Sequence, residues 1–325
     1  MEKIKFLTMA ALATAFFASC SNEDGLPQSN YPADNVVRIT TSVDGMNTRA
    51  SYGSSTAKLS SFGFCINNAG SDKYTYDNIK VTQEGSNWNP ATQMLWQNST
   101  TAVDILAYAP YQANGNVKIF GKSDYAFSVK EDQSIAEDYS SDLIVYKQTG
   151  FKPESDLNTN QAVNVAFTHL LSQLNLTIEL RDQFNQDEKK PVTSATVTDV
   201  KVNGTIISSK VDFSASPISV QVDDTQEATA ITPETTEFKA AGKTTDHAAF
   251  NYSAIVIPQT VTAGNFSISF KVDGTDYIWT STSDVNFVSG NKHQLSLLVG
   301  KDVVQVKGIT ATPWGKENIT QGETD

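Results

Sequence analysis

The chain has 325 residues, carries a formal net charge of −12 at pH 7 and contains two cysteines. So acidic a surface repels a nucleic-acid backbone, and the basic residues form no cluster, so nucleic acid is excluded as a partner. The length predicts two domains, each long enough to bury a core of its own.

The chain begins with a segment typical of export signals. Two lysines precede an apolar run at residues 6–18 that is too short to span a bilayer, so residues 1–19 are expected to be a cleaved signal peptide. Residues 17–20, Phe-Ala-Ser-Cys, resemble a lipobox, whose cysteine receives acyl chains such as palmitate. The segment that follows, Ser21-Asn22-Glu23-Asp24, resembles the acidic export signal of surface lipoproteins in Bacteroidetes-type bacteria. We therefore predict a lipid anchor at Cys20 in the outer membrane; the alternative is a plain signal peptide cleaved elsewhere.

Past residue 20, alternation of apolar and polar residues is the dominant pattern, which predicts strands with one buried and one solvated face. In chain order, clear runs lie at residues 36–43, 125–129, 163–167, 174–180, 266–272 and 295–299. Turn pairs such as Asn203-Gly204 and Asp273-Gly274 separate many of them. Helical periodicity is confined to a turn or two near residues 134–143, and the polar residues 221–249 are expected to be an extended surface excursion.

These elements predict an all-β fold of two tandem β-sandwich domains with mostly antiparallel sheets. The expected division is a signal peptide at 1–19, an N-terminal segment with the first strand at 20–49, an N-terminal sandwich at 50–170 and a C-terminal sandwich at 171–325.

The sequence contains no recognisable motif for catalysis, metal binding or cofactor binding. The three histidines share no metal-ligand spacing, and His169 is expected to pack or cap at the domain junction. Cys65, in "SFGFCIN", is expected to pack on the second face of a buried strand and not to act as a reactive thiol. Core packing is favoured over a sugar-stacking platform for the four tryptophans, Trp88, Trp96, Trp279 and Trp314.

Several longer segments occur in a characteristic order: the lipobox, "VRITTSVDGMNTRAS", "NPATQMLWQNSTTAVDILAYAPY", "SDLIVYK", "VNVAFTHLLSQLNLTIEL", "FVSGNKHQLSLLVG" and "ITATPW". This ordered set resembles fimbrillin-like proteins, the subunits of type V pili in Bacteroidales. The resemblance implies two transthyretin-like β-sandwich domains and export as a lipoprotein. It also implies polymerisation after an arginine-specific protease trims the N-terminus.

The chain offers that protease three arginines, Arg38, Arg49 and Arg181. Only Arg49 stands in a Ser/Gly-rich stretch after a predicted strand, where extended backbone is accessible. We therefore predict cleavage between Arg49 and Ala50, which would free residues 20–49 together with the lipid. The alternative is a surface arginine of no consequence.

Loss of the first strand would leave a vacant apolar groove. Full burial of Val37, Ile39 and Val43 corresponds to about 5–9 kcal/mol of gross hydrophobic stabilisation. A strand from a neighbouring subunit is expected to fill the groove by β-strand exchange, and head-to-tail repetition of that contact gives an open fibre.

The predicted function is therefore a structural and adhesive subunit of a surface fimbrium, without enzymatic activity. Its expected partners are other fimbrial subunits, an arginine-specific protease and a host or bacterial surface ligand. Only a short polar segment follows Trp314, which favours a tip or accessory subunit that accepts a strand without donating one. The alternative is a glycan-binding surface lipoprotein of a nutrient-uptake system.

Overall fold

The computed structural model describes residues 30–43, 58–113, 118–135, 137–184, 191–242 and 247–314. Strands make up nearly all of its regular structure, so the predicted all-β, mostly antiparallel fold is confirmed. In the described ranges the helices are single short turns, α1 (Pro153–Asp156) and the 3₁₀ turns Asp72–Tyr74 and Asp182–Phe184. None of them has the length or apolar character of a membrane-spanning helix.

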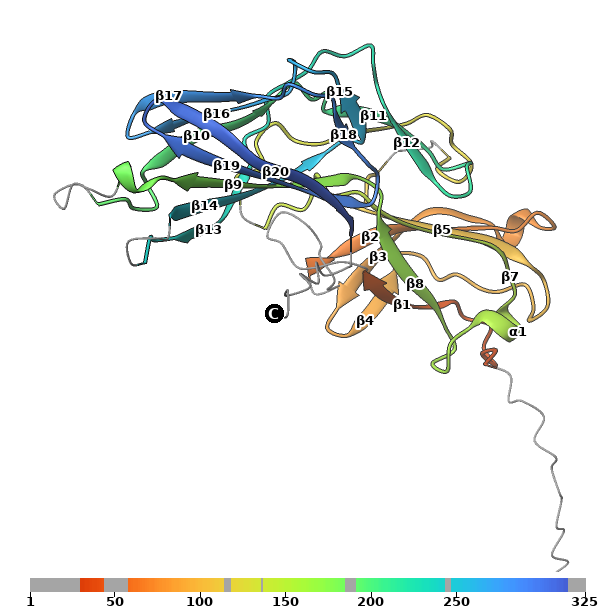
Figure 1. Ribbon diagram of the computed structural model, residues 1–325. Coiled ribbons are helices and arrows are strands. Elements are labelled where there is room, and N and C mark those ends of the chain that lie inside the picture. The colour runs from red at the N-terminus through yellow and green to blue at the C-terminus, as the bar shows by residue number, and fades with distance from the viewer. Residues whose placement is uncertain are drawn as a thin grey trace, which may run out of the picture.

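The first half of the chain builds a seven-stranded sheet, seen at the lower right of Figure 1. Its strands, in spatial order, are β1 (Arg38–Val43), β8 (Ala162–His169), β7 (Ile144–Phe151), β5 (Val103–Ala109), β2 (Ser61–Asn67), β3 (Tyr76–Glu84) and β4 (Asn87–Pro90). All neighbours are antiparallel except β1 and β8, which run parallel. The first strand of the chain, β1, therefore lies at one edge of this sheet.

The second half builds a five-stranded sheet and two smaller ones. The larger sheet contains β13 (Glu234–Lys239), β14 (Ala248–Val256), β9 (Ser172–Leu180), β19 (Asn291–Gly300) and β20 (Val303–Pro313), in that order. The others contain β10 (Val197–Asn203), β16 (Ser267–Val272) and β17 (Thr275–Thr280), and β15 (Gln259–Val261) with β18 (Val285–Phe287). β20 thus closes the larger sheet along one edge.

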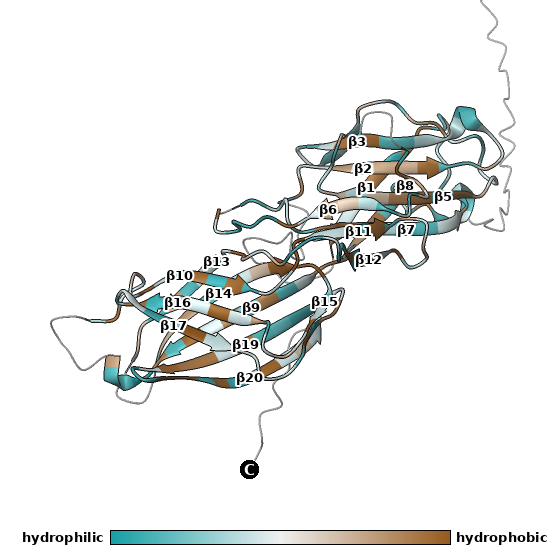
Figure 2. Cartoon of the chain, turned by 90° about the horizontal axis from the view of Figure 1, so that it is seen from above, coloured by the Kyte–Doolittle hydropathy of each residue, from teal (hydrophilic) through white to brown (hydrophobic). Residues whose placement is uncertain are grey.

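One three-stranded sheet combines both halves of the chain. β6 (Tyr125–Ser128) pairs with β11 (Ser208–Asp212), which also pairs with β12 (Ser219–Val222). Figure 2 shows these strands beside β5 and β7. The domain boundary between residues 170 and 171 stays a prediction. In the structure, strands from both sides of this position share one sheet.

Lys147, on β7, ties this shared sheet to the seven-stranded sheet. Its ammonium group donates hydrogen bonds to the carbonyl oxygens of Phe213, Ser214 and Ala215 at 2.8, 2.9 and 2.8 Å. Burial lowers the pKa of Lys147, because an ammonium group loses hydration there.

Replacing Lys147 by methionine should lower the free energy of unfolding by about 2–3 kcal/mol, since three carbonyl groups lose a charged donor. Lys152→Met is the matched control, because the Lys152 side chain is exposed. Urea unfolding of the two variants measures the difference, and equal midpoints would contradict the role given to Lys147.

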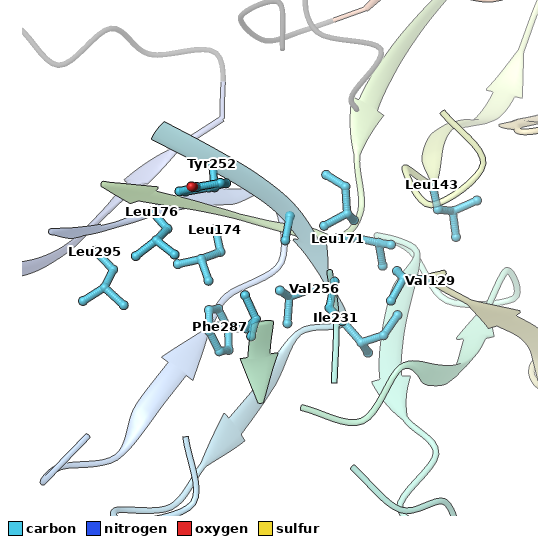
Figure 3. Packing of buried hydrophobic residues seen from close by; sticks show 14 of the residues in the cluster. Val129, Leu143, Leu171, Leu174, Leu176, Ile231, Tyr252, Val256, Phe287 and Leu295 are labelled. Atoms are coloured by element: carbon cyan, nitrogen blue, oxygen red, sulfur yellow. The ribbon is translucent and has the colours of Figure 1, made fainter. Parts of the chain in front are cut away.

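A continuous hydrophobic cluster joins the two halves. It runs from Val129 and Leu143 through Leu171 and Ile231 to Leu295, all of them buried, as Figure 3 shows. β8 leads almost directly into β9, so one extended stretch of backbone crosses between the large sheets. Packing on both sides of that stretch fixes the end of β8.

His293, on β19, lies in this buried region and makes stability depend on pH. Burial lowers the pKa of His293 below its usual 6.5, and the backbone N–H of Val288 donates to its Nε2 at 3.1 Å, which only a neutral ring can accept. The unfolded chain therefore binds more protons than the native chain just below pH 6.5.

The free energy of unfolding should consequently fall as the pH drops from about 7 to about 5, by at most about 1.4 kcal/mol per pH unit from this group. A His293→Gln variant keeps an acceptor but cannot titrate, so its decline should be smaller. Urea unfolding across this range compares the two slopes; identical slopes would show that His293 does not contribute.

Two local predictions were wrong. The described residues of 134–143 form turns and no helix, because the carboxylates of Asp132 and Asp138 accept hydrogen bonds from the backbone of Ser134 and Ser140. The stretch 221–249 is no simple surface excursion, since it contains β13 and the start of β14. Polar residues dominate β13 because it is the outer strand of its sheet. The sequence therefore shows no alternating pattern there.

Candidate functional site

The first strand of the chain, β1, occupies one edge of the seven-stranded sheet. It pairs in parallel with β8, in a register that places Arg38 opposite Ala162 and Val43 opposite Phe167. β8 itself is hydrogen-bonded to β7 on its other side. Without β1, β8 would therefore present one unpaired edge.

Three side chains anchor β1 and the residues directly before it in the core; we call residues 34–37 the lead-in to β1. Val37, Ile39 and Val43 are 2%, 6% and 6% exposed. They belong to the same buried cluster as Phe167, on β8, and Trp96, which follows β4. Their absence would leave hollows in this cluster.

The lead-in to β1 is also held on its second side. The N–H of Val37 donates to the carbonyl of Met94 at 3.0 Å, and the N–H of Trp96 donates to the carbonyl of Asn35 at 2.8 Å. These bonds form an antiparallel bridge that pairs Val36 with Leu95. Residues 35–43 consequently lie in a slot with β8 along one side and residues 94–96 beside its entrance; we call this the β1 slot.

Side-chain amides fasten the same segment from outside the core. Asn30 donates from Nδ2 to the carbonyl of Leu157, and Asn158 donates from Nδ2 to Oγ1 of Thr40, each at 3.0 Å. These contacts begin near the start of the described segment and extend to the middle of β1. The segment is therefore attached along its length.

An open groove of about 640 Å³ runs beside residues 36–40 of the β1 slot and is lined opposite by residues 86–90. Arg38 borders it and forms an ion pair with Asp34 at 2.6 Å. The Arg38 guanidinium, by its hydrogen bonds, lowers the pKa of Asp34. Both side chains are largely exposed, so this pair positions the lead-in more than it stabilises the fold.

The far end of β8 terminates in a buried polar cluster. His169 Nδ1 lies 2.9 Å from Asp142 Oδ1, and the His169 ring stacks on Trp314 with centroids 3.8 Å apart. The backbone N–H of Trp314 donates to the carbonyl of Gly290 at 2.7 Å. His169 thus connects the end of β8 to the residue after β20. Its contacts with Asp142 and Trp314 indicate a structural role in packing.

The predicted site residues divide into two groups. Val37, Ile39 and Val43 lie together in the β1 slot, whereas Cys20, Arg49 and Ala50 lie outside the described residues. Within the residues that the structure describes, no three His, Cys, Asp or Glu side chains gather as metal ligands would.

The tryptophans do not form an exposed platform. Trp96 stacks on Phe151 with centroids 5.7 Å apart, and Trp314 stacks on His169. Trp88 and Trp279 are half-buried and contact Phe62 and Phe266 respectively. This packing gives the glycan-binding alternative no support.

Cys65 is fully buried in β2. Burial raises the pKa of its thiol well above the ordinary value. The backbone N–H of Asn78 lies 3.2 Å from its sulfur. A thiol in this environment packs as a small apolar side chain and carries no nucleophilic role.

Sequence reasoning missed two parts of the slot, residues 94–96 and Asn158. Met94 and Trp96 are buried on either side of the exposed Leu95, so a short period-2 pattern was present there. Asn158 carries no comparable signal, because its partner Thr40 lies 118 residues earlier in the chain.

Comparison with known proteins places these features in a wider context. A model of the fimbrillin-like family matches residues 48–314. The matched range begins one residue before Arg49 and leaves β1 outside. A search of curated proteins gave no match.

Three solved structures with a similar fold come from Bacteroides species. A proposed cell adhesion protein from Bacteroides uniformis is 19% identical, with a TM-score of 0.57, over 87% of this chain and 99% of its own. One from Bacteroides ovatus is 13% identical, with a TM-score of 0.61, over 88% and 100%. A fimbrial protein from Bacteroides vulgatus is 16% identical, with a TM-score of 0.54, over 85% and 99%. At these identities the similarity shows a shared fold.

Proposed function

Because the chain belongs to the fimbrillin-like family, we propose that it is a structural and adhesive subunit of a surface fimbrium, without catalytic activity. The observation that carries this proposal is the β1 slot, in which an edge strand near the N-terminus fills an apolar site with Val37, Ile39 and Val43. An edge strand can be exchanged for another without rebuilding the rest of the sheet.

The proposed route to the fibre has three steps. The precursor reaches the cell surface as an outer-membrane lipoprotein anchored at Cys20, and an arginine-specific protease then cuts between Arg49 and Ala50. A strand from a neighbouring subunit finally replaces β1 and pairs with β8. The charge pattern of the leader and the Ser/Gly-rich surroundings of Arg49 support the first two steps.

We further propose a tip or accessory position for this subunit. β20 pairs with β19 along its whole length, from Val303 opposite Gly300 to Pro313 opposite Asn291, and so already serves its own sheet. A subunit in this position accepts a strand and presents its outer surface to a host or bacterial ligand.

Purified precursor treated with an arginine-specific protease, together with the partner subunits produced by the same cells, tests this function. Electron microscopy should show this subunit incorporated into fibres, and Arg49→Ala should reduce incorporation by at least about tenfold, because the tethered β1 keeps the slot filled. Arg181→Ala is the control and should assemble normally. Equal incorporation of Arg49→Ala and the wild type would refute the processing site.

A further inference from the structure

The contacts of β1 bear on what a protease cut does to the slot. Within the described part of the chain, hydrogen bonds and strand pairing hold residues 30–43 to residues 94–96 and 157–167, and β1 also contacts β4. All of these partners lie after residue 57. A cut in residues 44–57 therefore removes none of these contacts.

We infer that cleavage after Arg49 leaves β1 in its slot as a noncovalent plug, and that a competing strand must displace the plug before subunits can join. The inference rests on the proposed function and adds a second, partner-dependent step to it. Attachment at Asn30, at Asn35–Val37, at Thr40 and at Val43 means that the segment must lose several distant contacts before it leaves.

Cleavage still changes the competition, because it removes a tether. A strand joined covalently to the domain that it occupies competes at an effective concentration of about 1 mM, whereas a cut strand at micromolar concentration competes about 10³-fold less well. Once displaced, the cut segment diffuses away. The protease thus makes the exchange irreversible in practice, and the incoming strand sets its timing.

β1 fits its slot with one unfavourable group, and this group indicates which strand would bind better. Oγ1 of Thr41 is buried and makes no hydrogen bond to any described part of the protein. A strand that runs parallel to β8 and carries aliphatic side chains at the positions of Val37, Ile39, Thr41 and Val43 would fill the slot without this unpaired hydroxyl. The slot therefore favours an incoming strand with four alternating aliphatic residues over β1.

The test follows the released fragment. Full-length protein is cut with an arginine-specific protease under native conditions and passed over a size-exclusion column at micromolar concentration. We expect a denaturing gel to show two pieces and the column to show one peak that contains both in equal amounts. Separation of the N-terminal piece immediately after cleavage would overturn the inference and leave the proposed function standing.

Exchange against a labelled synthetic peptide of residues 30–49 measures how firmly the plug is held. Thr41→Val should slow its release about tenfold, since it removes a buried unpaired hydroxyl, whereas Ile39→Ala should speed release at least about tenfold. Ser42→Ala is the control, because Ser42 is exposed on the same strand, and should change nothing. Equal rates for all three variants would contradict the plug.

If the protease leaves Arg49 uncut, the proposed processing fails, but the plug can still be examined. Replacing residues 51–55 with the recognition sequence of another protease allows the same connection to be cut. Retention of the N-terminal piece then supports the inference independently of Arg49, and its immediate loss overturns it.

Discussion

An Ile39→Glu substitution should expel β1 from its slot without any protease. The glutamate loses about 1.5–3 kcal/mol of hydrophobic burial and adds several kcal/mol for a buried, unpaired carboxylate. Together these costs are comparable to the entire aliphatic burial of the strand, which is about 5–9 kcal/mol. The remaining sheets keep their own cores, so the strand should leave while the rest of the fold persists.

Cleavage at Arg38 reports this release, because a protease can bind only backbone that is free of its sheet and Arg38 is paired with β8 while β1 is docked. We expect an arginine-specific protease to cut Ile39→Glu at Arg38 at least about tenfold faster than the wild type, together with increased binding of an apolar dye. Ser42→Glu is the matched control, since it places the same charge on the exposed side of the strand. Similar resistance of Arg38 in both variants would argue against a removable strand.

A Gly204→Ala substitution should destabilise the protein by more than about 3 kcal/mol, because it combines backbone strain with a collision. Gly204 has a φ of +91° at the end of β10. A Cβ there would lie 2.0 Å from the carbonyl oxygen of Asn265, which is backbone and cannot move aside without shifting the chain before β16.

Gly274→Ala separates the two causes. Gly274 has a similar φ of +85°, but a Cβ there meets nothing within 4 Å. It should therefore cost only about 1 kcal/mol, the price of a positive φ alone. Thermal or urea unfolding measures both variants, and equal losses would show that the close approach at Gly204 is relieved by small movements.

The regular alternation of the sequence was sufficient to identify many of the strands. The runs at residues 36–43, 163–167 and 174–180 correspond to β1, β8 and β9, since one face of each is buried and the other is solvated. β13 escaped notice because an outer strand buries little, so polar residues can occupy most of it. Alternation reports burial, and it weakens wherever burial is incomplete.

The same limit applies to the β1 slot. The aliphatic residues Val37, Ile39 and Val43 could be assigned to a buried face from their spacing alone, because side chains on a strand alternate between its two sides. Their neighbours could not be assigned in this way. The pairing with β8 and the bridge to residues 94–96 join parts of the chain that are more than 50 residues apart.

The sequence by itself thus determined the strand content, the buried face of the first strand and the resemblance to fimbrillin-like proteins, because these depend on local composition and order. Only the tertiary structure decided that β1 is an edge strand parallel to β8, that among the described residues it is held by residues 94–96 and 157–167, and that β6 shares a sheet with β11. Strand partners and sheet edges arise from long-range packing, which a linear pattern of apolar residues does not encode.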